Sequence, residues 1–313
     1  MTSAAPGVSG AAEISGADPR RKLRTKKRTR IVTTLALLAL PTIVYSAFII
    51  YPVIRVIGLS LWHWDGLGTA TWAGFDNYAA IWEDDRLRAA FLHGLVLIFF
   101  FAVLPILIGL PLASMLIRSR APGLGFFRTV VFLPQVIAMV VLAVAWRNIY
   151  AIDGPINTVL GWFGVRMSEP FLGSFTWALP AVGFIGTWVS TGLVTVLLMS
   201  SIARVSESYY EAATIDGVGP LGKFWYITLP AVRAEILVSI TLTTINALKT
   251  FDLVYMTTAG GPGTSTTVPA YEVYYQAFRA GSVGTASALA VVLTVLIFAI
   301  NVAVNVFGER EKG

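Results

Sequence analysis

The chain has 313 residues, of which 56% are hydrophobic and only 13% are charged. A soluble domain carries about 25% charged residues, so this composition indicates an integral membrane protein. No cysteine occurs, which excludes disulfides, thiolate metal sites and cysteine nucleophiles. The net charge of +6 does not indicate a nucleic-acid ligand, because eight of the 23 Lys and Arg residues lie between Arg20 and Arg30, just before the first apolar run. This arrangement predicts a cytoplasmic N-terminus.

Residues 1–30 are expected to form a disordered basic tail in the cytoplasm, since their Ala, Gly, Ser and Pro residues offer little to pack. Residues 31–308 are expected to form the transmembrane domain, and residues 309–313 a second cytoplasmic tail. The apolar runs predict an all-α membrane protein with six transmembrane helices, each long enough to cross a bilayer. The predicted spans cover residues 31–59, 89–117, 129–146, part of 170–203, 236–258 and 283–307.

The connections between the spans alternate in character, which predicts that both termini are cytoplasmic. Residues 60–88 hold tryptophans and an acidic run, and residues 147–173 are rich in turns with balanced charge, so both are assigned to the outer side together with residues 259–263. The link between Arg118 and Arg128 and the stretch of about 204–234 are bounded by arginines. These two connections are assigned to the cytoplasm.

The longest polar interruption in the second half of the chain runs from Glu211 to Pro230. Ser208 lies three residues before Glu211, the spacing of a capping box that begins a helix. Glycine accepts turn conformations and proline suits the first position of a helix, so a bend is expected at Gly217, Gly219 and Pro220. A second short helix with an apolar stripe would follow, and Pro230 would end it. Two such amphipathic helices are well suited to dock on another protein.

This stretch resembles the EAA loop of binding-protein-dependent ABC importer permeases. The matching residues are Glu211, Ala212, Ala213, Asp216, Gly217, Phe224, Ile227, Leu229 and Pro230. Two further stretches, Phe251–Tyr255 with the following Gly260-Gly261-Pro262 and Phe75–Tyr78, are similar to the carbohydrate-uptake group of this family. The resemblance covers essentially the whole chain after Arg30 and implies the type I importer permease fold. Val218 and Ala234 depart from the alanine and proline that are usual in the family.

The resemblance implies a permease subunit in the cell membrane that imports a di- or oligosaccharide by alternating access and is not itself an enzyme. The EAA loop would sit in a groove of a separate ATP-binding subunit, and the implied coupling residues are Glu211, Ala212, Ala213, Asp216, Gly217, Leu229 and Pro230. The implied partners are a second homologous permease in a heterodimer, two ATP-binding cassette subunits and an extracellular solute-binding protein.

The chain is predicted to bind no cofactor or metal ion itself. The phosphate-binding pattern Gly-x-x-x-x-Gly-Lys-Ser/Thr does not occur, and the glycine-rich residues 260–264 lack its lysine. ATP and Mg²⁺ are therefore expected on the partner subunit. No catalytic residue is predicted either, since the sequence holds only two histidines, His63 and His93, and no paired carboxylates within the spans.

Polar residues within the fourth and fifth predicted spans are candidates for the substrate path. Positions i, i+3 and i+4 share one face of a helix. The polar residues of the fourth span have this spacing, and those of the fifth span nearly repeat it. Their hydroxyl and amide groups suit a polyol, but small polar residues also join helices to one another in membranes. A tryptophan beside them suits stacking on a sugar ring as well as packing. The candidates are Thr187, Trp188, Ser190, Thr191, Thr243, Asn246, Lys249 and Thr250.

Lys249 and Asp252 lie three residues apart in the predicted fifth span, where ionisable residues pair with one another or line a pathway. A mutual structural pair is the preferred interpretation. Alternatively, Lys249 contacts a phosphate group, which would indicate a glycerol-phosphate-type solute. His93 and Gln135 are isolated and are expected to be structural.

Two other classes of protein are alternatives to the importer permease. A membrane-embedded enzyme would need a catalytic constellation, and the sequence offers none. An ion-coupled secondary transporter would favour buried carboxylates that bind the coupling ion, whereas the first four predicted spans are almost free of charge. The importer permease is therefore the preferred hypothesis.

Overall fold

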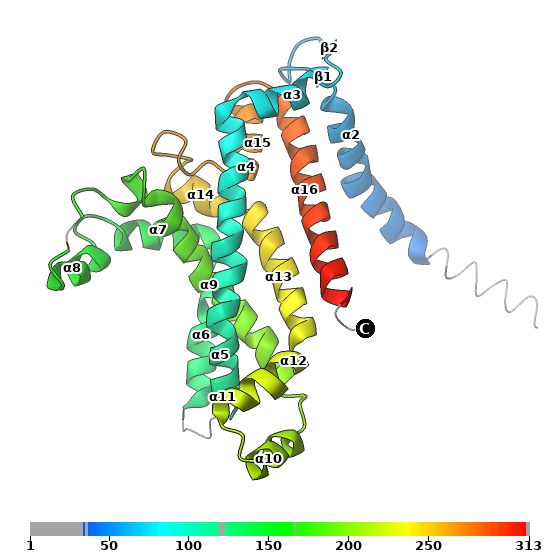
Figure 1. Cartoon of the computed structure of the whole chain (residues 1–313). Helices are drawn as coiled ribbons and strands as arrows, with labels where there is room; N and C mark the ends of the chain where they lie inside the picture. The colour runs from blue at the N-terminus through cyan, green and yellow to red at the C-terminus, as the bar shows by residue number, and fades with distance from the viewer. Residues whose placement is uncertain (1–33, 35–36, 119–122, 166, 311–313) are drawn as a thin grey trace, which may run out of the picture. The chain divides into compact units, whose positions relative to one another are not determined.

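The computed structural model describes residue 34 and residues 37–118, 123–165 and 167–310 (Figure 1). The predicted basic tail of residues 1–30 lies outside this part of the chain, as do the middle of the predicted link between Arg118 and Arg128 and the last three residues of the predicted C-terminal tail. By internal contacts the chain divides into two units, Met1–Arg55 and Val56–Gly313.

The first predicted span is helical from Leu37 to Leu59 and is long and apolar enough to cross a membrane. It contains the π-helical turn η1 (Ser46–Ile50) and the helix α2 (Tyr51–Leu59). The connection that follows, which is predicted to lie on the outer side, is folded rather than irregular. Strands β1 (Trp62–His63) and β2 (Thr71–Trp72) form an antiparallel pair, and α3 (Asp76–Glu83) follows them. The Asn77 amide donates to the carbonyls of Ser60 and Trp62, which fixes α3 to the hairpin.

In the described residues of the rest of the second unit, all further secondary structure is helical, which confirms the predicted all-α class. Its longer helices are α4 (Asp85–Ile98), α5 (Leu104–Arg118), α6 (Leu124–Val136), α7 (Met139–Ile149), α9 (Ala178–Ile202), α13 (Arg233–Leu248), α15 (Pro269–Phe278) and α16 (Val283–Arg310). The shorter elements are η2 (Phe99–Val103), α8 (Pro155–Trp162), η3 (Phe171–Gly173), α10 (Glu207–Ile215), α11 (Pro220–Lys223), η4 (Phe224–Thr228), α12 (Leu229–Ala231) and α14 (Asp252–Thr257).

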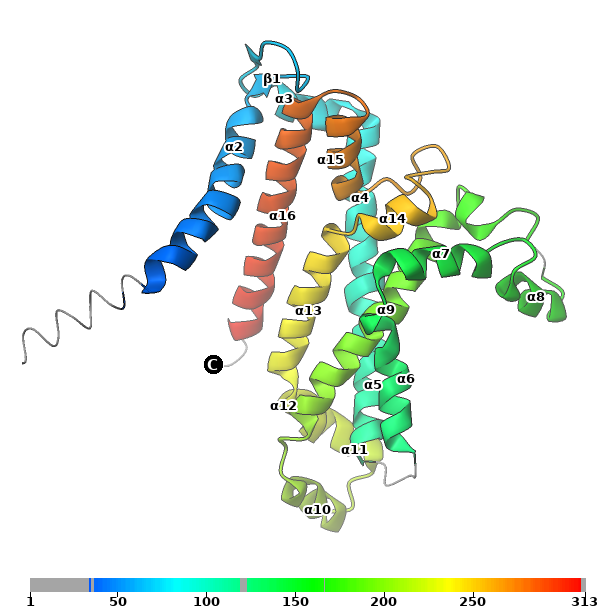
Figure 2. The same ribbon diagram turned by 180° about the vertical axis from the view of Figure 1, so that it is seen from behind.

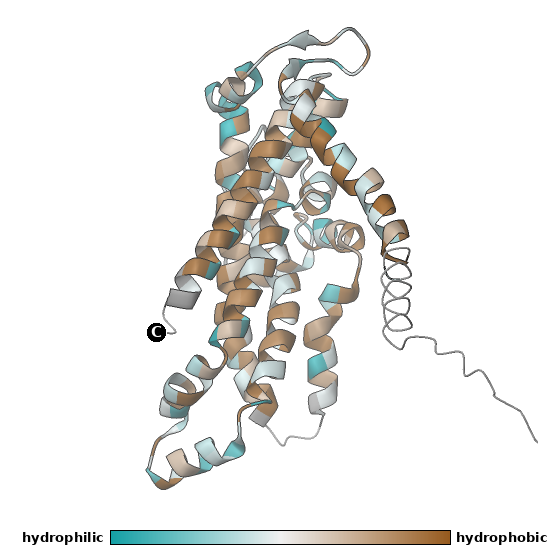
Figure 3. Cartoon of the chain, turned by 90° about the vertical axis from the view of Figure 1, so that its right-hand side faces the viewer, coloured by the Kyte–Doolittle hydropathy of each residue, from teal (hydrophilic) through white to brown (hydrophobic). Residues whose placement is uncertain are grey.

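Four helices of the described chain can each cross a membrane by length and composition, and two bent helix pairs bring the number to as many as six. The second, fourth and sixth predicted spans appear as continuous helices. The second is Asp85–Ile117, which begins four residues before the predicted start because the Asp84 side chain accepts hydrogen bonds from the first amides of α4. The sixth helix continues to Arg310, into the predicted C-terminal tail. Apolar residues dominate these long helices (Figure 3).

The third predicted span is a bent pair rather than one continuous helix. α6 and α7 meet at an angle of 101°, and the two residues between them, Ile137 and Ala138, are extended. Pro134 lies in the last turn of α6 and cannot donate a backbone hydrogen bond there, which weakens the helix just before the break.

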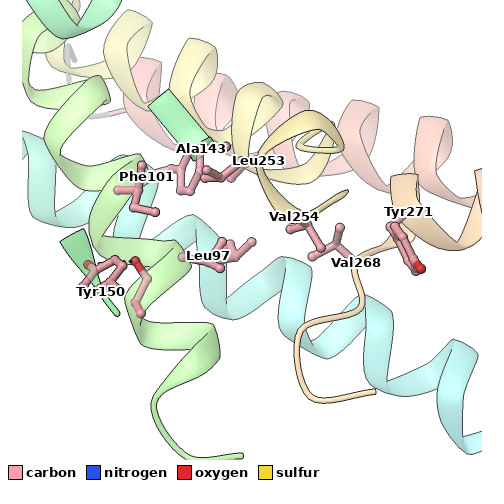
Figure 4. Packing of buried hydrophobic residues seen from close by; sticks show 12 residues of the cluster. Leu97, Phe101, Ala143, Tyr150, Leu253, Val254, Val268 and Tyr271 are labelled. Atoms are coloured by element: carbon pink, nitrogen blue, oxygen red, sulfur yellow. Dashed lines mark hydrogen bonds between the residues drawn. The ribbon is translucent and has the colours of Figure 1, made fainter. Parts of the chain in front are cut away.

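The fifth predicted span also departs from a single helix. α13 ends at Leu248, the chain turns through residues 249–251, and α14 begins at Asp252. No proline or glycine marks this break. Its cause is tertiary, because Leu253 and Val254 are fully buried in a cluster with Ala143 of α7 (Figure 4). The elements beyond the two breaks, α7 and α14, therefore pack against each other.

Helix α9 is the most buried of the candidate spans and packs against α5, α6 and η2. Its glycines make the close packing possible. A Cβ atom on Gly183 would lie 2.4 Å from the Phe100 ring, and one on Gly186 would lie 1.9 Å from the Phe101 ring. Small residues at helix contacts allow backbones to approach closely, which is the main source of helix association within a bilayer.

The π-helical turns share one sequence feature. Each is followed by a proline one residue beyond the amide that closes the wide turn: Pro52 after η1, Pro105 after η2 and Pro230 after η4. In an α-helix a proline ring collides with the carbonyl four residues before it. The wider turn moves that carbonyl aside, so the helix continues past the proline.

Replacing Gly186 with alanine is expected to lower the thermal stability of the purified protein. The added methyl group would overlap the Phe101 ring, and overpacking of this kind costs about 1–3 kcal/mol. Gly125→Ala in α6 is the matched control, because a Cβ atom there meets nothing within 4 Å. Unfolding in detergent, followed by tryptophan fluorescence, compares the two variants. Equal midpoints would contradict the close packing of α9.

Candidate functional site: an exposed helical loop and a polar pocket

The predicted docking stretch forms a small helical appendage between α9 and α13. Both views place α10 beyond the ends of α5 and α9, at the end of these helices opposite α15 (Figures 1 and 2). The N-cap of α10 is Ser206, and Ser208 is already the second residue of the helix. The predicted capping box of Ser208 and Glu211 is therefore wrong. The Ser206 hydroxyl instead lies 2.8 Å from that of Ser208.

The predicted bend after this helix is present. Gly217 has a φ of +75°, a left-handed conformation that glycine adopts without strain, and Pro220 is the first residue of α11. The second helix continues through η4 and α12 to Ala231, so Pro230 does not end it as predicted. The wide turn of η4 accommodates this proline. The helix ends one residue later, and α13 begins at an angle of 67° to it.

Contacts with the long helices hold the appendage in place. Phe224 and Leu229 pack against the buried cluster that includes Leu110 and Leu198. The two halves of the appendage are also joined to each other. The Lys223 ammonium donates to the Thr214 hydroxyl at 2.5 Å, and the Val218 amide donates to the Ala213 carbonyl at 2.8 Å.

The outer face of the appendage is exposed and partly apolar. Glu211, Ala212 and Asp216 are exposed, and Ala213 is half-buried. Large apolar side chains accompany them, and Ile215 and Tyr226 retain 86% and 82% of their surface. Further exposed apolar residues are Tyr209, Leu221 and Trp225. Clusters of exposed apolar residues of this kind mark sites of protein interaction.

A polar pocket of about 290 Å³ lies where the two helix breaks meet. Half of the predicted substrate-path residues line it, namely Ser190, Asn246, Lys249 and Thr250. Gln135, which was expected to be structural, lines it too. Its position directly after Pro134, at the end of α6, is the sequence signal that could have identified it. The rest of the wall consists of Phe101, Met139, Val189, Phe251, Asp252 and Leu253.

The other four candidates do not line the pocket; they form hydrogen bonds or ring contacts within the protein. The hydroxyl of Thr187 donates to the carbonyl of Phe100, which ties α9 to η2, and the hydroxyl of Thr191 donates to the carbonyl of Thr187. Thr243 is fully buried and donates within its own helix. Trp188 meets Trp146 edge to face, with ring centroids 5.5 Å apart.

Lys249 and Asp252 do not lie on one helix, because the break between α13 and α14 separates them. Among the residues that the structure describes, no ion pair joins them. Both line the polar pocket. The predicted structural pair is therefore absent from this structure. The Nδ1 atom of His93 lies 2.9 Å from the Thr267 carbonyl, which fits the predicted structural role of His93.

Comparison with known proteins gives consistent similarities. Residues 94–312 match the family described as "Binding-protein-dependent transport system inner membrane component". The lactose transport system permease protein LacF of Rhizobium radiobacter is 31% identical over 85% of this chain and 90% of its own length. The diacetylchitobiose uptake system permease protein NgcF of Streptomyces coelicolor is 30% identical over 91% and 84%.

A solved structure shares the fold. It is the crystal structure of a bacterial alginate ABC transporter in complex with an alginate pentasaccharide-bound periplasmic protein, and one of its chains superposes with a TM-score of 0.75. The match covers 91% of this chain and 96% of that chain at 21% sequence identity. The described helices thus follow a known architecture of importer subunits.

Replacing Gly217 with alanine is expected to loosen the appendage. A side chain in the left-handed region costs about 1–2 kcal/mol, so local opening should become about tenfold more frequent. Gly219→Ala is the matched control, since both positions have open space for a Cβ atom and only Gly217 has a positive φ. Hydrogen–deuterium exchange of the amides of residues 207–232 measures the difference. Equal exchange in both variants would show that the bend does not need glycine.

Proposed function

The chain belongs to the family of binding-protein-dependent transport system inner membrane components, and we propose from this premise that it carries a di- or oligosaccharide across the membrane, driven by ATP hydrolysis on a separate subunit. As a permease subunit of the membrane it is not an enzyme. The observation that carries the proposal is the exposed appendage of α10–α12, a partly apolar surface at one end of the long helices.

The appendage is the proposed docking site of the ATP-binding subunit. Its exposed apolar side chains would be buried in the interface, and Glu211 would pair with a basic group of the partner. Phe224 and Leu229 would pass a displacement of the docked appendage on to α5 and α9, against which they pack. ATP and Mg²⁺ would be bound by that partner.

Charge supports placing the appendage in the cytoplasm. Arg128 at the start of α6, Arg204 before α10 and Arg233 after α12 are all near the same end of the helices. Lys and Arg are enriched on the cytoplasmic side of membrane proteins. The hairpin of β1 and β2 and helix α15 would then face outward, toward a solute-binding protein.

The polar pocket is the proposed substrate path. It offers the amides of Gln135 and Asn246 and the hydroxyls of Ser190 and Thr250, groups that match the hydroxyls of a sugar, with the ring of Phe251 beside them. Irregular backbone at membrane depth is tolerated where it lines a cavity, and the two helix breaks do so here. Its volume is near the lower end of ligand pockets, which fits a path that a second permease completes.

One observation favours a second candidate substrate. Lys249 lines the pocket without an ion-pair partner in the described part of the chain, so a glycerol-phosphate-type solute could bind there through its phosphate group. Asp252 lies in the same wall and opposes this, since its carboxylate would repel the phosphate. A sugar is therefore the preferred substrate. Family membership speaks against a secondary transporter or an enzyme.

The proposed assembly contains a second homologous permease, two ATP-binding subunits and an extracellular solute-binding protein. The crystal structure of the alginate transporter, which contains an alginate pentasaccharide-bound periplasmic protein, supports the solute-binding component of this assembly.

Glu211→Lys is expected to reduce ATP-driven sugar uptake at least about tenfold, because reversing a charge within a desolvated interface costs several kcal/mol. Glu169→Lys is the control, the same charge change at an exposed carboxylate outside the appendage. Uptake of labelled di- and oligosaccharides is measured in cells that express the chain with its partner subunits, and immunoblots of membranes check its level. Unchanged uptake in Glu211→Lys would refute docking through this residue.

Asn246→Leu is expected to lower sugar uptake about tenfold, because loss of one buried hydrogen bond to the substrate costs about 1–3 kcal/mol. Thr243→Val is the matched control one turn away on α13. Its hydroxyl bonds only within its own helix, so uptake should remain within about twofold of the native rate. The same uptake assay serves both variants. A larger loss in Thr243→Val than in Asn246→Leu would contradict the assignment of the pocket.

A further inference from the structure

A second pocket, of about 560 Å³, lies between α7, α14 and α15. It is at the end of the long helices opposite α10, as the positions of α15 and α10 in Figures 1 and 2 show. Its wall is dominated by four tyrosines and two arginines, namely Tyr255, Tyr271, Tyr274, Tyr275, Arg147 and Arg279. Neither the residues of the α10–α12 appendage nor those that line the polar pocket contribute to it.

The tyrosine rings form a continuous aromatic surface. The ring centroid of Tyr255 lies 5.3 Å from that of Tyr274, which it meets edge to face, and 6.4 Å from that of Tyr271. Tyr255 also stacks on Phe251, with centroids 5.2 Å apart and ring planes 21° from parallel. Because Phe251 lines the polar pocket and Tyr255 lines the second pocket, this stacked pair lies between the two pockets. Aromatic faces of this kind hold the apolar C–H faces of sugar rings.

The charge of the second pocket is positive. Arg147 and Arg279 form no ion pair among the described residues, and no carboxylate is part of the pocket wall. The Arg279 guanidinium interacts with the hydroxyls of Tyr274 and Tyr255, which raises its pKa. A guanidinium binds a carboxylate through paired, charge-assisted hydrogen bonds, so two of them beside aromatic rings select for an anionic group.

An arginine outside the pocket contacts α15, the helix that forms part of the pocket wall. The Nε atom of Arg86 donates to the fully buried Glu272 carboxylate at 2.8 Å, and the Arg86 guanidinium lies 3.8 Å from the centre of the Tyr275 ring. The carboxylate on α15 is thereby paired with an arginine outside the pocket. It therefore does not compensate the charge of Arg147 and Arg279, and its ion pair anchors the helix that carries Tyr271, Tyr274 and Tyr275.

We propose that this tyrosine–arginine pocket is a binding subsite for an acidic saccharide, whose carboxylate meets Arg147 and Arg279 while a sugar ring lies against Tyr255, outside the polar pocket that contains Asp252. The inference rests on the proposed function of sugar import and narrows its substrate class to uronic-acid-type oligosaccharides. The arginines select the acid group, and the aromatic surface accepts the sugar ring regardless of its hydroxyl pattern.

The absence of native cysteine allows a specific test. Met256 lines the pocket, so Met256→Cys places one thiol in it. The assembled transporter, purified through a tag on this chain and held in lipid nanodiscs, is labelled with sulfonatoethyl methanethiosulfonate. The rate at which the thiol of this chain is labelled is measured at increasing concentrations of trigalacturonate or of its methyl ester. The ester has nearly the same size but carries no charge. Gel filtration confirms that each variant is folded.

Trigalacturonate is expected to protect the thiol at an about tenfold lower concentration than the ester, the discrimination that one charge-assisted hydrogen bond provides. Adding Arg147→Gln and Arg279→Gln should remove this difference, and adding Arg128→Gln, an exposed arginine on α6, should not. The negatively charged sulfonate reagent is also expected to label the thiol faster than its trimethylammonium counterpart. This difference should disappear in the double arginine variant.

Equal protection by acid and ester, unchanged by the arginine substitutions, would overturn the acid selectivity. Protection by neither compound would overturn the pocket as a subsite. Both outcomes leave the proposed import of sugars intact. That proposal fails on a different result, if the native complex, supplied with ATP and its binding protein, takes up no saccharide at all.

Discussion

The contact between the glycine face of α9 and the phenylalanines of η2 is the constraint on which the rest of the structure depends. Gly183 and Gly186 leave no room for even a methyl group against Phe100 and Phe101. A bilayer offers no hydrophobic driving force between helices, so such interlocking contacts must hold them together. Fixed in this way, α9 carries Ser190 to the polar pocket and ends at the base of α10. One helix thereby connects the proposed site of transport with the proposed site of energy input.

The two helix breaks are the second organising feature. Backbone groups that leave a helix within a membrane must find partners in protein or in a wet cavity. Here the breaks between α6 and α7 and between α13 and α14 occur at the same place, and the elements beyond them pack together around Leu253 and Val254. The irregular backbone is thus shielded from lipid on one side and lines a polar pocket on the other.

Much of this architecture could be predicted from the sequence, because apolar length and the Gly217–Pro220 bend are local signals. The break after Leu248 could not, since no residue there opposes a helix and the cause is burial against a distant segment. The same limit divides the candidate path. Spacing predicts that Thr187 and Ser190 share one helix face, but only the neighbours of that face decide that Thr187 bonds to Phe100 whereas Ser190 reaches the pocket.

The prolines after the π-helical turns bear on how the helices transmit motion. One additional residue in a turn rotates the following helical faces by about 100°. A wide turn that migrates along a helix shifts the register of one half of the helix relative to its neighbours. Proline opposes this, because the carbonyl before it must stay displaced for the ring to fit. Pro105 therefore fixes the register of the helix formed by η2 and α5. Pro230 fixes that of the α11–α12 segment, which would move as one unit when a force acts on it.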